Sequence, residues 1–310
     1  MVSRPGLLTS VQDLGRWGSQ ALGVPVSGAM DTYAHRLANA LVGNSAGLAT
    51  LEITLVGPEL RAEPALIAAV AGAEFAVTVD GRLVGHQTPF TLAPGSTLRF
   101  GERRGGSRAY LAVAGGIDTP VVMGSRSTHL VSGIGGLGGR ALFGGDVLPV
   151  GTAASPRART IRPFLRREAV APPSLRVMLG PQDAWFSRHA IDALFHQMFR
   201  VSTSSNRMGY RLEGPALASV RAEEPLSEPV PFGAIQVPAG GAPILLMADR
   251  QTAGGYPKIA TVITADLPLA GQLGPGDVVR FAACTRAEAR AALIAREREL
   301  LRAMPEDLDS

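Results

Sequence analysis

Two short apolar runs with a polar loop between them constrain the fold of this chain more than any other feature. The runs are Ile244 to Ala248 and Ile259 to Ile263, and both are partly β-branched. Runs of this length and composition favour buried strands over helices. Gly254 and Gly255, followed by Pro257, require a tight, irregular path between the strands. The sequence therefore predicts a polar loop held at both ends by rigid strands, an arrangement typical of functional sites.

This loop carries the densest set of functional groups in the sequence. Its polar side chains are Asp249, Arg250, Gln251, Thr252, Tyr256 and Lys258. An arginine can bind a carboxylate or phosphate bidentately, a lysine can neutralise charge on a developing oxyanion, and an aspartate can orient either group or act as a base. A second polar turn adds the complementary groups Ser204, Asn206 and Arg207. We interpret Asp249, Arg250 and Lys258 as catalytic and the others as substrate-binding, for a carboxylated, phosphorylated or amide-containing small molecule.

Lys258 is the only lysine of the chain. The sequence has 30 lysine and arginine residues, and all the others are arginines. A chain that uses arginine everywhere else has kept a compact ammonium here, which a planar guanidinium cannot replace. In the alternative interpretation, Asp249 and Arg250 form a solvated turn pair and Lys258 has no special role. The residues alone leave both interpretations open.

The glycine and proline content predicts a mostly β chain with a few helices. The 310 residues include 37 glycines and 23 prolines but few aromatic residues, which is typical of many short strands joined by turns. A hydrophobic content of 46% is ample for a buried core. Residues 57–60, 122–128 and 145–148 are faintly repeated, in the same order, by residues 214–217, 246–252 and 276–279. We therefore predict two related β domains packed together, with ligands bound at the seam between them.

A break rich in proline and arginine separates the two predicted domains. Residues 151–174 contain four prolines and five arginines, which is typical of a solvated linker. The predicted domains are residues 1–155 and 175–284, followed by a C-terminal helix and tail at residues 285–310. Thr285 and Glu288 have the spacing of a capping box, and the helix that they begin is expected to reach Met304.

Asp31 marks the start of a predicted helix in the first domain. The apolar residues that follow share one helical face, and they are Ala34, Leu37, Ala38, Leu41 and Val42. Asp31 can cap the first turn, and Gly43 suits the left-handed position after the last. In the functional interpretation, Ser27 to Asp31 also form a wall of the substrate site at the positive end of this helix.

Alternating and apolar patterns place the other elements. Strands are expected at residues 66–70, 75–79, 97–100, 109–114, 147–150 and 175–179, and a helix at 183–199. Asp80 and Gly81, between two alternating runs, predict a two-residue hairpin. Gly133 to Gly138 formally matches a dinucleotide fingerprint. Because this segment neither clearly follows a strand nor opens a helix, a glycine loop is favoured.

Several function classes have no support in the residues. The five histidines lack metal-ligand spacing, and His189 and His196 are expected to be packing or surface residues of one helix. Cys284 is the only cysteine, without a base nearby, so no disulfide or acyl-transfer nucleophile is expected. The formal charge of +4 comes from scattered arginines, which favours anionic small molecules over nucleic acid. Because no signal peptide or membrane-length apolar run is present, we expect a cytoplasmic protein without a membrane partner.

Four long motifs carry a resemblance to a known family. They are residues 11–16, 23–31, 206–212 and 248–258. These segments resemble the signatures of the biotin-dependent carboxyltransferase family, which includes the C-type subunit of 5-oxoprolinase, the protein labelled allophanate hydrolase subunit 2, and the Kip antagonist. The resemblance covers about residues 4–282, and the tail helix beyond Thr285 lies outside it.

The resemblance implies a fold, partners and an activity. It implies two tandem cyclophilin-like β-barrel domains. This fold does not by itself imply prolyl isomerase activity. The implied function is that of the C-type chain in ATP-dependent 5-oxoprolinase, which hydrolyses 5-oxoproline to glutamate together with an A-type chain and a Kip-inhibitor-like B-type chain. ATP is expected at the level of the complex. Arg250 and Lys258 would suit a lactam whose amide oxygen is phosphorylated.

The same family leaves two alternatives open. One is the carboxyltransferase component of a biotin-dependent urea or amide carboxylase. Because this chain has no biotin-accepting Met-Lys-Met segment, another domain would have to supply the biotin. The second is a non-catalytic regulator, similar to the Kip antagonist, that binds an inhibitor of a kinase.

Overall fold

The computed structural model describes residues 1–153, 172–221, 223 and 225–303. Most of the predicted linker and the predicted helix end at Met304 lie outside these residues. The chain divides into two compact units. The described residues of the first unit fall within Met1–Trp17, Ser27–Leu165 and Arg298–Ser310, and those of the second within Gly18–Val26 and Arg166–Glu297.

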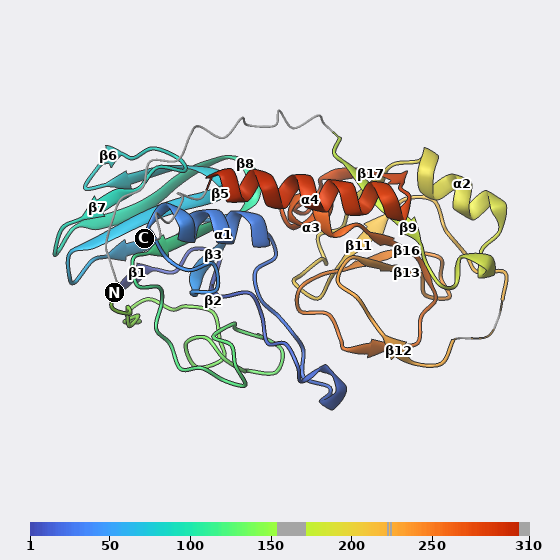
Figure 1. Cartoon of the computed structure of the whole chain (residues 1–310), viewed down its shortest axis with the longest axis horizontal. Coiled ribbons are helices and arrows are strands. Elements are labelled where there is room, and N and C mark those ends of the chain that lie inside the picture. Colours follow the sequence, from blue (N-terminus) through green and yellow to red (C-terminus); the bar gives the residue numbers. More distant parts are fainter. Residues whose placement is uncertain (154–171, 222, 224, 304–310) are drawn as a thin grey trace, which may run out of the picture. The chain divides into compact units, whose positions relative to one another are not determined.

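The first unit is built on a curled eight-stranded sheet (Figure 1). Its strands are β1 (Val2–Arg4), β2 (Leu8–Gln12), β3 (Thr50–Thr54), β4 (Glu59–Arg61), β5 (Leu66–Val79), β6 (Arg82–Leu83), β7 (Phe90–Leu92) and β8 (Thr97–Val113). The order is β1-β4-β8-β3-β2, and β5 pairs with β6, β7 and β8 off this path. The long strands β5 and β8 pair antiparallel with register shifts between Gly72 and Val77. Such irregularities bend a sheet, which is consistent with the curl.

The mostly β prediction is confirmed, and four of the predicted strands merge into two. Residues 66–70 and 75–79 are both part of β5, and residues 97–100 and 109–114 are both part of β8. Gly72 and Gly105 lie at a shift of the β5–β8 register, and both strands continue through them. The strand predicted at 147–150 is wrong. Only Val150 forms an isolated bridge, with Ile117, and Pro149 has no N–H for a ladder.

Helix α1 (Thr32–Leu41) covers one face of the long strands β5 and β8. The backbone N–H of Ala34 donates to Oδ1 of Asp31 at 2.8 Å, so the predicted cap is confirmed. Gly43 has a φ of 76°, as the left-handed position after a helix requires. The apolar face of α1 forms one core with alternate residues of the sheet, and the inner face of the curl forms another. The Asp80 and Gly81 hairpin is also confirmed, with φ of 46° and 81° between β5 and β6.

A fully buried histidine in α1 gives the first unit a pH-dependent stability. Burial lowers the pKa of His35 to about 4, and its ring nitrogens lie 2.9 Å from Thr50 Oγ1 and 3.2 Å from the Ala46 carbonyl oxygen. Since the unfolded chain binds a proton below pH 6.5 and the folded chain only near pH 4, stability falls across this window as pH falls. We expect a loss of about 3 kcal/mol between pH 7 and pH 4.

Hydrogen exchange of the α1 amides at pH 7 and about pH 4, corrected for the intrinsic rates, measures this loss. A His35→Gln variant is expected to reduce it, whereas the exposed His189→Gln change should leave it intact. An equal pH dependence in wild type and His35→Gln would contradict the assignment.

The second unit is a closed barrel (Figure 1). Its strands, in spatial order, are β10 (Phe199–Val201), β11 (Gly209–Glu213), β14 (Ile244–Leu246), β13 (Ala234–Gln236), β16 (Lys258–Val262), β9 (Ser174–Leu179) and β17 (Val278–Ala283). A two-stranded ribbon joins β12 (Glu228–Pro229) to β15 (Ala253–Gly254). The two apolar runs that flank the polar loop are therefore strands β14 and β16, as the sequence predicts. The remaining helical segments are η1 (Gln20–Leu22), η2 (Asp183–Trp185), α2 (Arg188–His196), η3 (Thr264–Asp266), α3 (Leu267–Gly271) and α4 (Arg286–Ala303).

Two helix predictions have different outcomes. The helix predicted at 183–199 is interrupted, because Phe186 is extended and Ser187 caps a new helix by accepting from Ala190 N–H at 3.1 Å. The capping box is confirmed: Thr285 N–H donates to Glu288 Oε2 at 2.8 Å, and Glu288 N–H donates to Thr285 Oγ1 at 3.2 Å.

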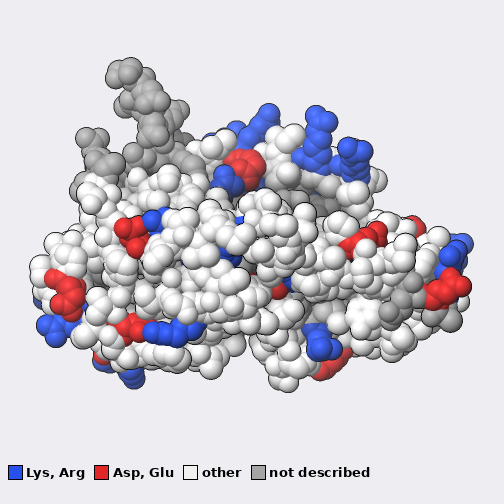
Figure 2. Space-filling view, turned by 90° about the horizontal axis from the view of Figure 1, so that it is seen from below, with Lys and Arg blue, Asp and Glu red and all other residues white. Residues whose placement is uncertain are grey.

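The glycine loop, the positions of two histidines and the distribution of surface charge agree with the predictions from sequence. No helix directly follows Gly133 to Gly138, which forms turns and isolated bridges, as the glycine-loop interpretation requires. His189 and His196 lie exposed on α2. On the face drawn in Figure 2, lysine and arginine side chains are scattered among acidic ones. Within the described ranges, no helix has both the length and the apolar character needed to cross a bilayer.

Candidate functional site

The single lysine lies inside the second unit, fixed by two side chains. Lys258 opens strand β16 and is only 3% exposed. Its Nζ donates to Glu228 Oε1 at 2.5 Å. Gln182 joins the two residues, because its Oε1 accepts from Lys258 N–H at 3.0 Å and its Nε2 donates to the same Glu228 oxygen at 2.6 Å. The ammonium is therefore held in one place before any ligand arrives.

Glu228 supplies the negative charge beside this ammonium. The hydrogen bond from Lys258, followed by that from Gln182, lowers the pKa of Glu228. Its side chain is 37% exposed, whereas that of Lys258 is 3% exposed. The buried ammonium is thus paired with a carboxylate that solvent and small molecules can reach.

The buried amide of Gln236 and the half-buried amide of Gln251 extend the group around Lys258. Gln236 lies on β13 directly opposite Lys258 in the β13–β16 ladder. Its Nε2 donates to the Tyr256 carbonyl oxygen at 3.3 Å, and its Oε1 accepts from Gln251 Nε2 at 3.2 Å. A Cβ at Gly254 would lie 3.0 Å and 3.1 Å from these two amide nitrogens, so this position favours glycine. We call Gln182, Glu228, Gln236, Gln251 and Lys258 the lysine cluster.

The ion pair between Lys258 and Glu228 has a defined pH dependence. A depressed carboxyl pKa means that the pair contributes stability above the unfolded value of 4.5 and that this contribution disappears as pH falls through the lower folded value. A Glu228→Gln variant is expected to lose this acid-side dependence. Thermal melts of both proteins between about pH 3 and pH 7 measure it. Parallel curves for the two proteins would contradict the role given to Glu228.

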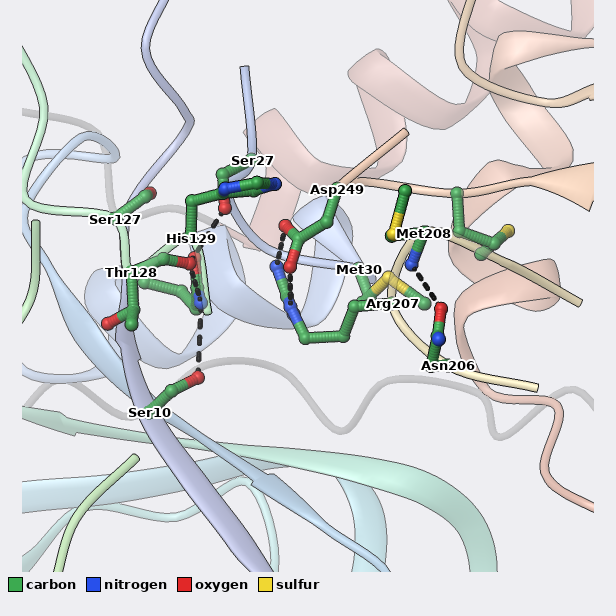
Figure 3. A network of polar contacts seen from close by, with 12 residues as sticks. Ser10, Ser27, Met30, Ser127, Thr128, His129, Asn206, Arg207, Met208 and Asp249 are labelled. Atoms are coloured by element: carbon green, nitrogen blue, oxygen red, sulfur yellow. Dashed lines mark hydrogen bonds and ion pairs between the residues drawn. The ribbon is translucent and has the colours of Figure 1, made fainter. Parts of the chain in front are cut away.

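A second charged pair lies buried elsewhere in the same unit. Arg207 donates from Nε to Asp249 Oδ2 at 2.9 Å and from Nη2 to Oδ1 at 3.0 Å (Figure 3). The side chains are 4% and 3% exposed. Asp249 N–H also donates to the Arg207 carbonyl oxygen at 2.9 Å. This bidentate pair fixes the turn before β11 to the start of the polar loop.

Arg250 points into the protein. Its Nε donates to the Val230 carbonyl oxygen at 2.9 Å, and its guanidinium lies 5.4 Å from the centre of the Phe232 ring. Burial lowers its pKa to about 10, although the charge of Asp249 acts in the opposite direction. In this arrangement Arg250 holds the loop against the segment that follows Glu228.

The other predicted residues of the second unit lie at its surface or support the loop. Ser204 is exposed and donates to Ser202 Oγ at 3.3 Å, and Asn206 Oδ1 accepts from Met208 N–H at 2.8 Å. The Thr252 carbonyl oxygen accepts from Val230 N–H at 3.1 Å. Tyr256 is 40% exposed, so its side chain is open to solvent.

Ser27 and Asp31 lie in the first unit, in a strained and buried turn. Ser27 has a φ of 58°, in the left-handed region that residues with a side chain rarely adopt, and its Oγ donates to the Thr128 carbonyl oxygen at 2.8 Å. A Cβ at Gly28 would lie 2.9 Å from Gly15 N, so the backbone there approaches too closely for any other residue. Asp31 N–H donates to the Tyr110 hydroxyl oxygen at 2.8 Å. Asp31 therefore caps helix α1, and the buried Tyr110 hydroxyl supports the turn in which it lies.

The structure gathers some predicted residues and adds others. Lys258 and Gln251 lie in the lysine cluster, Arg207 and Asp249 form their own pair, and Arg250 faces the interior. Sequence reasoning missed Gln182, Glu228 and Gln236. A glutamine inside the apolar run around Ile235 was a usable signal for Gln236, but Glu228 precedes a proline in a loop and carried none. Across the described residues, no group of three or more His, Cys, Asp or Glu side chains could hold a metal ion.

Comparison with known proteins gives a consistent result. The sequence profile of the family described as "Carboxyltransferase domain, subdomain A and B" matches residues 22–283. The C-type subunit of 5-oxoprolinase from Escherichia coli is 41% identical over 290 residues, which cover 93% of this chain and 92% of that protein. The urea amidolyase of Saccharomyces cerevisiae is 33% identical over 90% of this chain and 16% of its own length.

Solved structures agree with these relatives. The crystal structure of Kluyveromyces lactis urea amidolyase superimposes on the whole chain with a TM-score of 0.91 and 32% identity. This chain spans 20% of that polypeptide. The crystal structure of TTHA0988 covers 91% of this chain with a TM-score of 0.79 and 40% identity, and 55% of that chain is matched.

Proposed function

Because the chain belongs to the carboxyltransferase domain family, we propose that it is the C-type subunit of a 5-oxoprolinase, an enzyme component that acts together with A-type and B-type partner chains. The family resemblance read from the motifs is confirmed. The near full-length match to the C-type subunit of 5-oxoprolinase supports this function over that of the much longer urea amidolyases. The proposed reaction is the ATP-dependent hydrolysis of 5-oxoproline to glutamate.

The lysine cluster is the observation that carries the chemical part of this proposal. Opening a lactam places negative charge on its amide oxygen, and a fixed, desolvated ammonium stabilises such charge. In our proposal Lys258 provides that ammonium, and Glu228 and Gln182 position it. Gln251 and Tyr256 provide hydrogen-bonding groups to the substrate beside it.

The other proposed site residues have supporting or binding roles. Asp249 orients Arg207, which we assign to the substrate carboxylate, and Arg250 maintains the loop between them. Ser204, Asn206 and Thr252 lie on neighbouring turns of the same unit. We also keep Ser27 and Asp31 as substrate-binding residues, because the strained turn that holds them is typical of functional positions.

The loop that formally matches a dinucleotide fingerprint does not have the structure of such a site. The glycine-rich loop at 133–138 is not followed by a helix whose N-terminus could bind phosphate. We therefore assign ATP to a partner chain. The energy of its hydrolysis would drive the ring opening, and this chain would contribute the charged groups that receive the substrate.

Reconstitution tests the proposed function. The chain is mixed with the A-type and B-type chains of the same source, and glutamate is measured with 5-oxoproline and ATP. Glutamate is expected only when all three chains and ATP are present, with omission of each chain as the control. If the assembled complex releases no glutamate, the proposed function is wrong.

A carboxyltransferase acting on urea or a related amide is the second candidate. The TM-score of 0.91 to urea amidolyase favours it, because the fold is retained over the whole chain. This function requires a biotinylated carrier from another protein and consumes bicarbonate. Glutamate release that is unaffected by avidin and by removal of bicarbonate would exclude it, whereas urea-dependent ATP consumption that requires bicarbonate would support it.

A further inference from the structure

The curled sheet of the first unit contains a hollow that the side chains around it do not fill. The cavity has a volume of about 320 Å³, and all its lining residues belong to this unit. Most of the wall consists of aliphatic side chains from β3, β4, β5, β7 and β8, among them Leu51, Leu60, Leu66, Leu92, Leu98 and Val113. Protein interiors are close-packed and leave few voids larger than a water molecule. A hollow of this size in an apolar core is therefore a candidate ligand site.

Its size and lining indicate the class of ligand. An apolar cavity of about 150 Å³ stays dry and binds benzene. A cavity about twice as large has room for roughly ten to twelve carbon atoms, by the same comparison. Since aliphatic side chains form the wall, the buried part of the ligand must be a hydrocarbon chain.

Three charged groups belong to residues that line the cavity: the Met1 ammonium, which donates to the Arg61 carbonyl oxygen at 2.8 Å, and the side chains of Arg61 and Glu63, which are both about half exposed. Arg61 Nε lies 4.0 Å from Glu63 Oε1, which is too far for a hydrogen bond. The N–H groups of the Arg61 guanidinium can therefore donate to an acceptor other than Glu63. Guanidinium groups bind carboxylates bidentately. We propose that this cavity binds an aliphatic monocarboxylate of about ten carbons, with the chain in the hollow and the carboxylate on Arg61. The site is separate from the lysine cluster and does not depend on the proposed function.

Titration of the whole purified chain with decanoate, below the concentration at which decanoate self-associates, tests the proposal. Isothermal titration calorimetry should show one saturable site with a negative heat-capacity change. Hexanoate lacks four methylene groups and should bind about 100-fold more weakly. No saturable binding of decanoate, or equal binding of decanoate and hexanoate, would overturn the proposal.

Two substitutions place the ligand in the hollow. Val113→Phe and Val150→Phe put a larger side chain on two separate parts of the lining and should each weaken decanoate binding at least tenfold. Val121→Phe is the matched control, because Val121 is 54% exposed and does not line the cavity, and its binding should equal that of wild type. Wild-type affinity in both lining variants would refute the location. If either variant fails to fold, decanoate-induced shifts of the leucine and valine methyl resonances in the wild-type chain decide the same point.

The head group is tested separately. Arg61→Gln should weaken decanoate but not decanol, and Arg82→Gln, an exposed arginine on β6, is the matched control. Stronger binding of decylamine than of decanoate would mean that Glu63, and not Arg61, binds the head group of the ligand. That result would overturn the choice of a carboxylate. An absence of binding by decanoate, decanol and decylamine alike would show that the hollow is occupied or closed in solution, which would overturn the proposal as a whole.

Discussion

Replacing Lys258 by arginine is expected to lower kcat of the assembled complex of three chains by about 100-fold or more. The change keeps the positive charge, so only the shape and the donor geometry of the group are altered. Lys258 Nζ is buried 2.5 Å from Glu228 Oε1, and a planar guanidinium cannot direct its donors from that point as a compact ammonium does. Glutamate release under saturating 5-oxoproline and ATP measures the effect.

The controls separate chemistry from assembly. Arg211→Lys is the reverse change at an exposed position of β11 and should retain full turnover. Size-exclusion chromatography with the A-type and B-type chains shows whether Lys258→Arg still assembles. Turnover within twofold of wild type would remove Lys258 from the catalytic residues, although the chain could still be the C-type component of the complex. A variant that assembles but turns over slowly would support the assignment.

Replacing Asp249 by asparagine is expected to destabilise the second unit by about 3–5 kcal/mol, because the change leaves the buried Arg207 guanidinium without its bidentate carboxylate. Removing one partner of a buried pair exposes the full desolvation penalty of the other charge. An exposed arginine of the same unit gives the contrast, since Arg211→Gln on β11 should change stability by less than about 1 kcal/mol.

Tryptophan fluorescence can report on the second unit alone. The chain has two tryptophans, and a Trp17→Phe background leaves only Trp185, which lies in the second unit. Urea unfolding of Asp249→Asn in this background measures the loss. The double change Arg207→Met with Asp249→Leu should be less destabilising than the sum of its single changes, because no unpaired charge remains. Additive effects would mean that the pair contributes no coupling energy.

Local physical chemistry determined much of this protein from its sequence. The Asp31 cap, the Asp80–Gly81 hairpin, the Thr285–Glu288 capping box and the strands on either side of the polar loop depend on neighbouring residues. Each is therefore visible within a few positions of the chain. The lone Lys258 could also be singled out, because composition makes it unusual.

Tertiary structure alone decided which groups meet. Glu228 lies 30 residues before Lys258, and Arg207 lies 42 residues before Asp249, so no spacing rule connects them. The Arg250 side chain points into the protein because it donates to the Val230 carbonyl oxygen and packs on the Phe232 ring, which both belong to another segment. Whether a β sheet closes into a barrel or stays open as a curl, leaving a hollow, depends on the register of strands far apart in the sequence. Sequence patterns define which face of a strand is apolar, but long-range pairing decides what that face encloses.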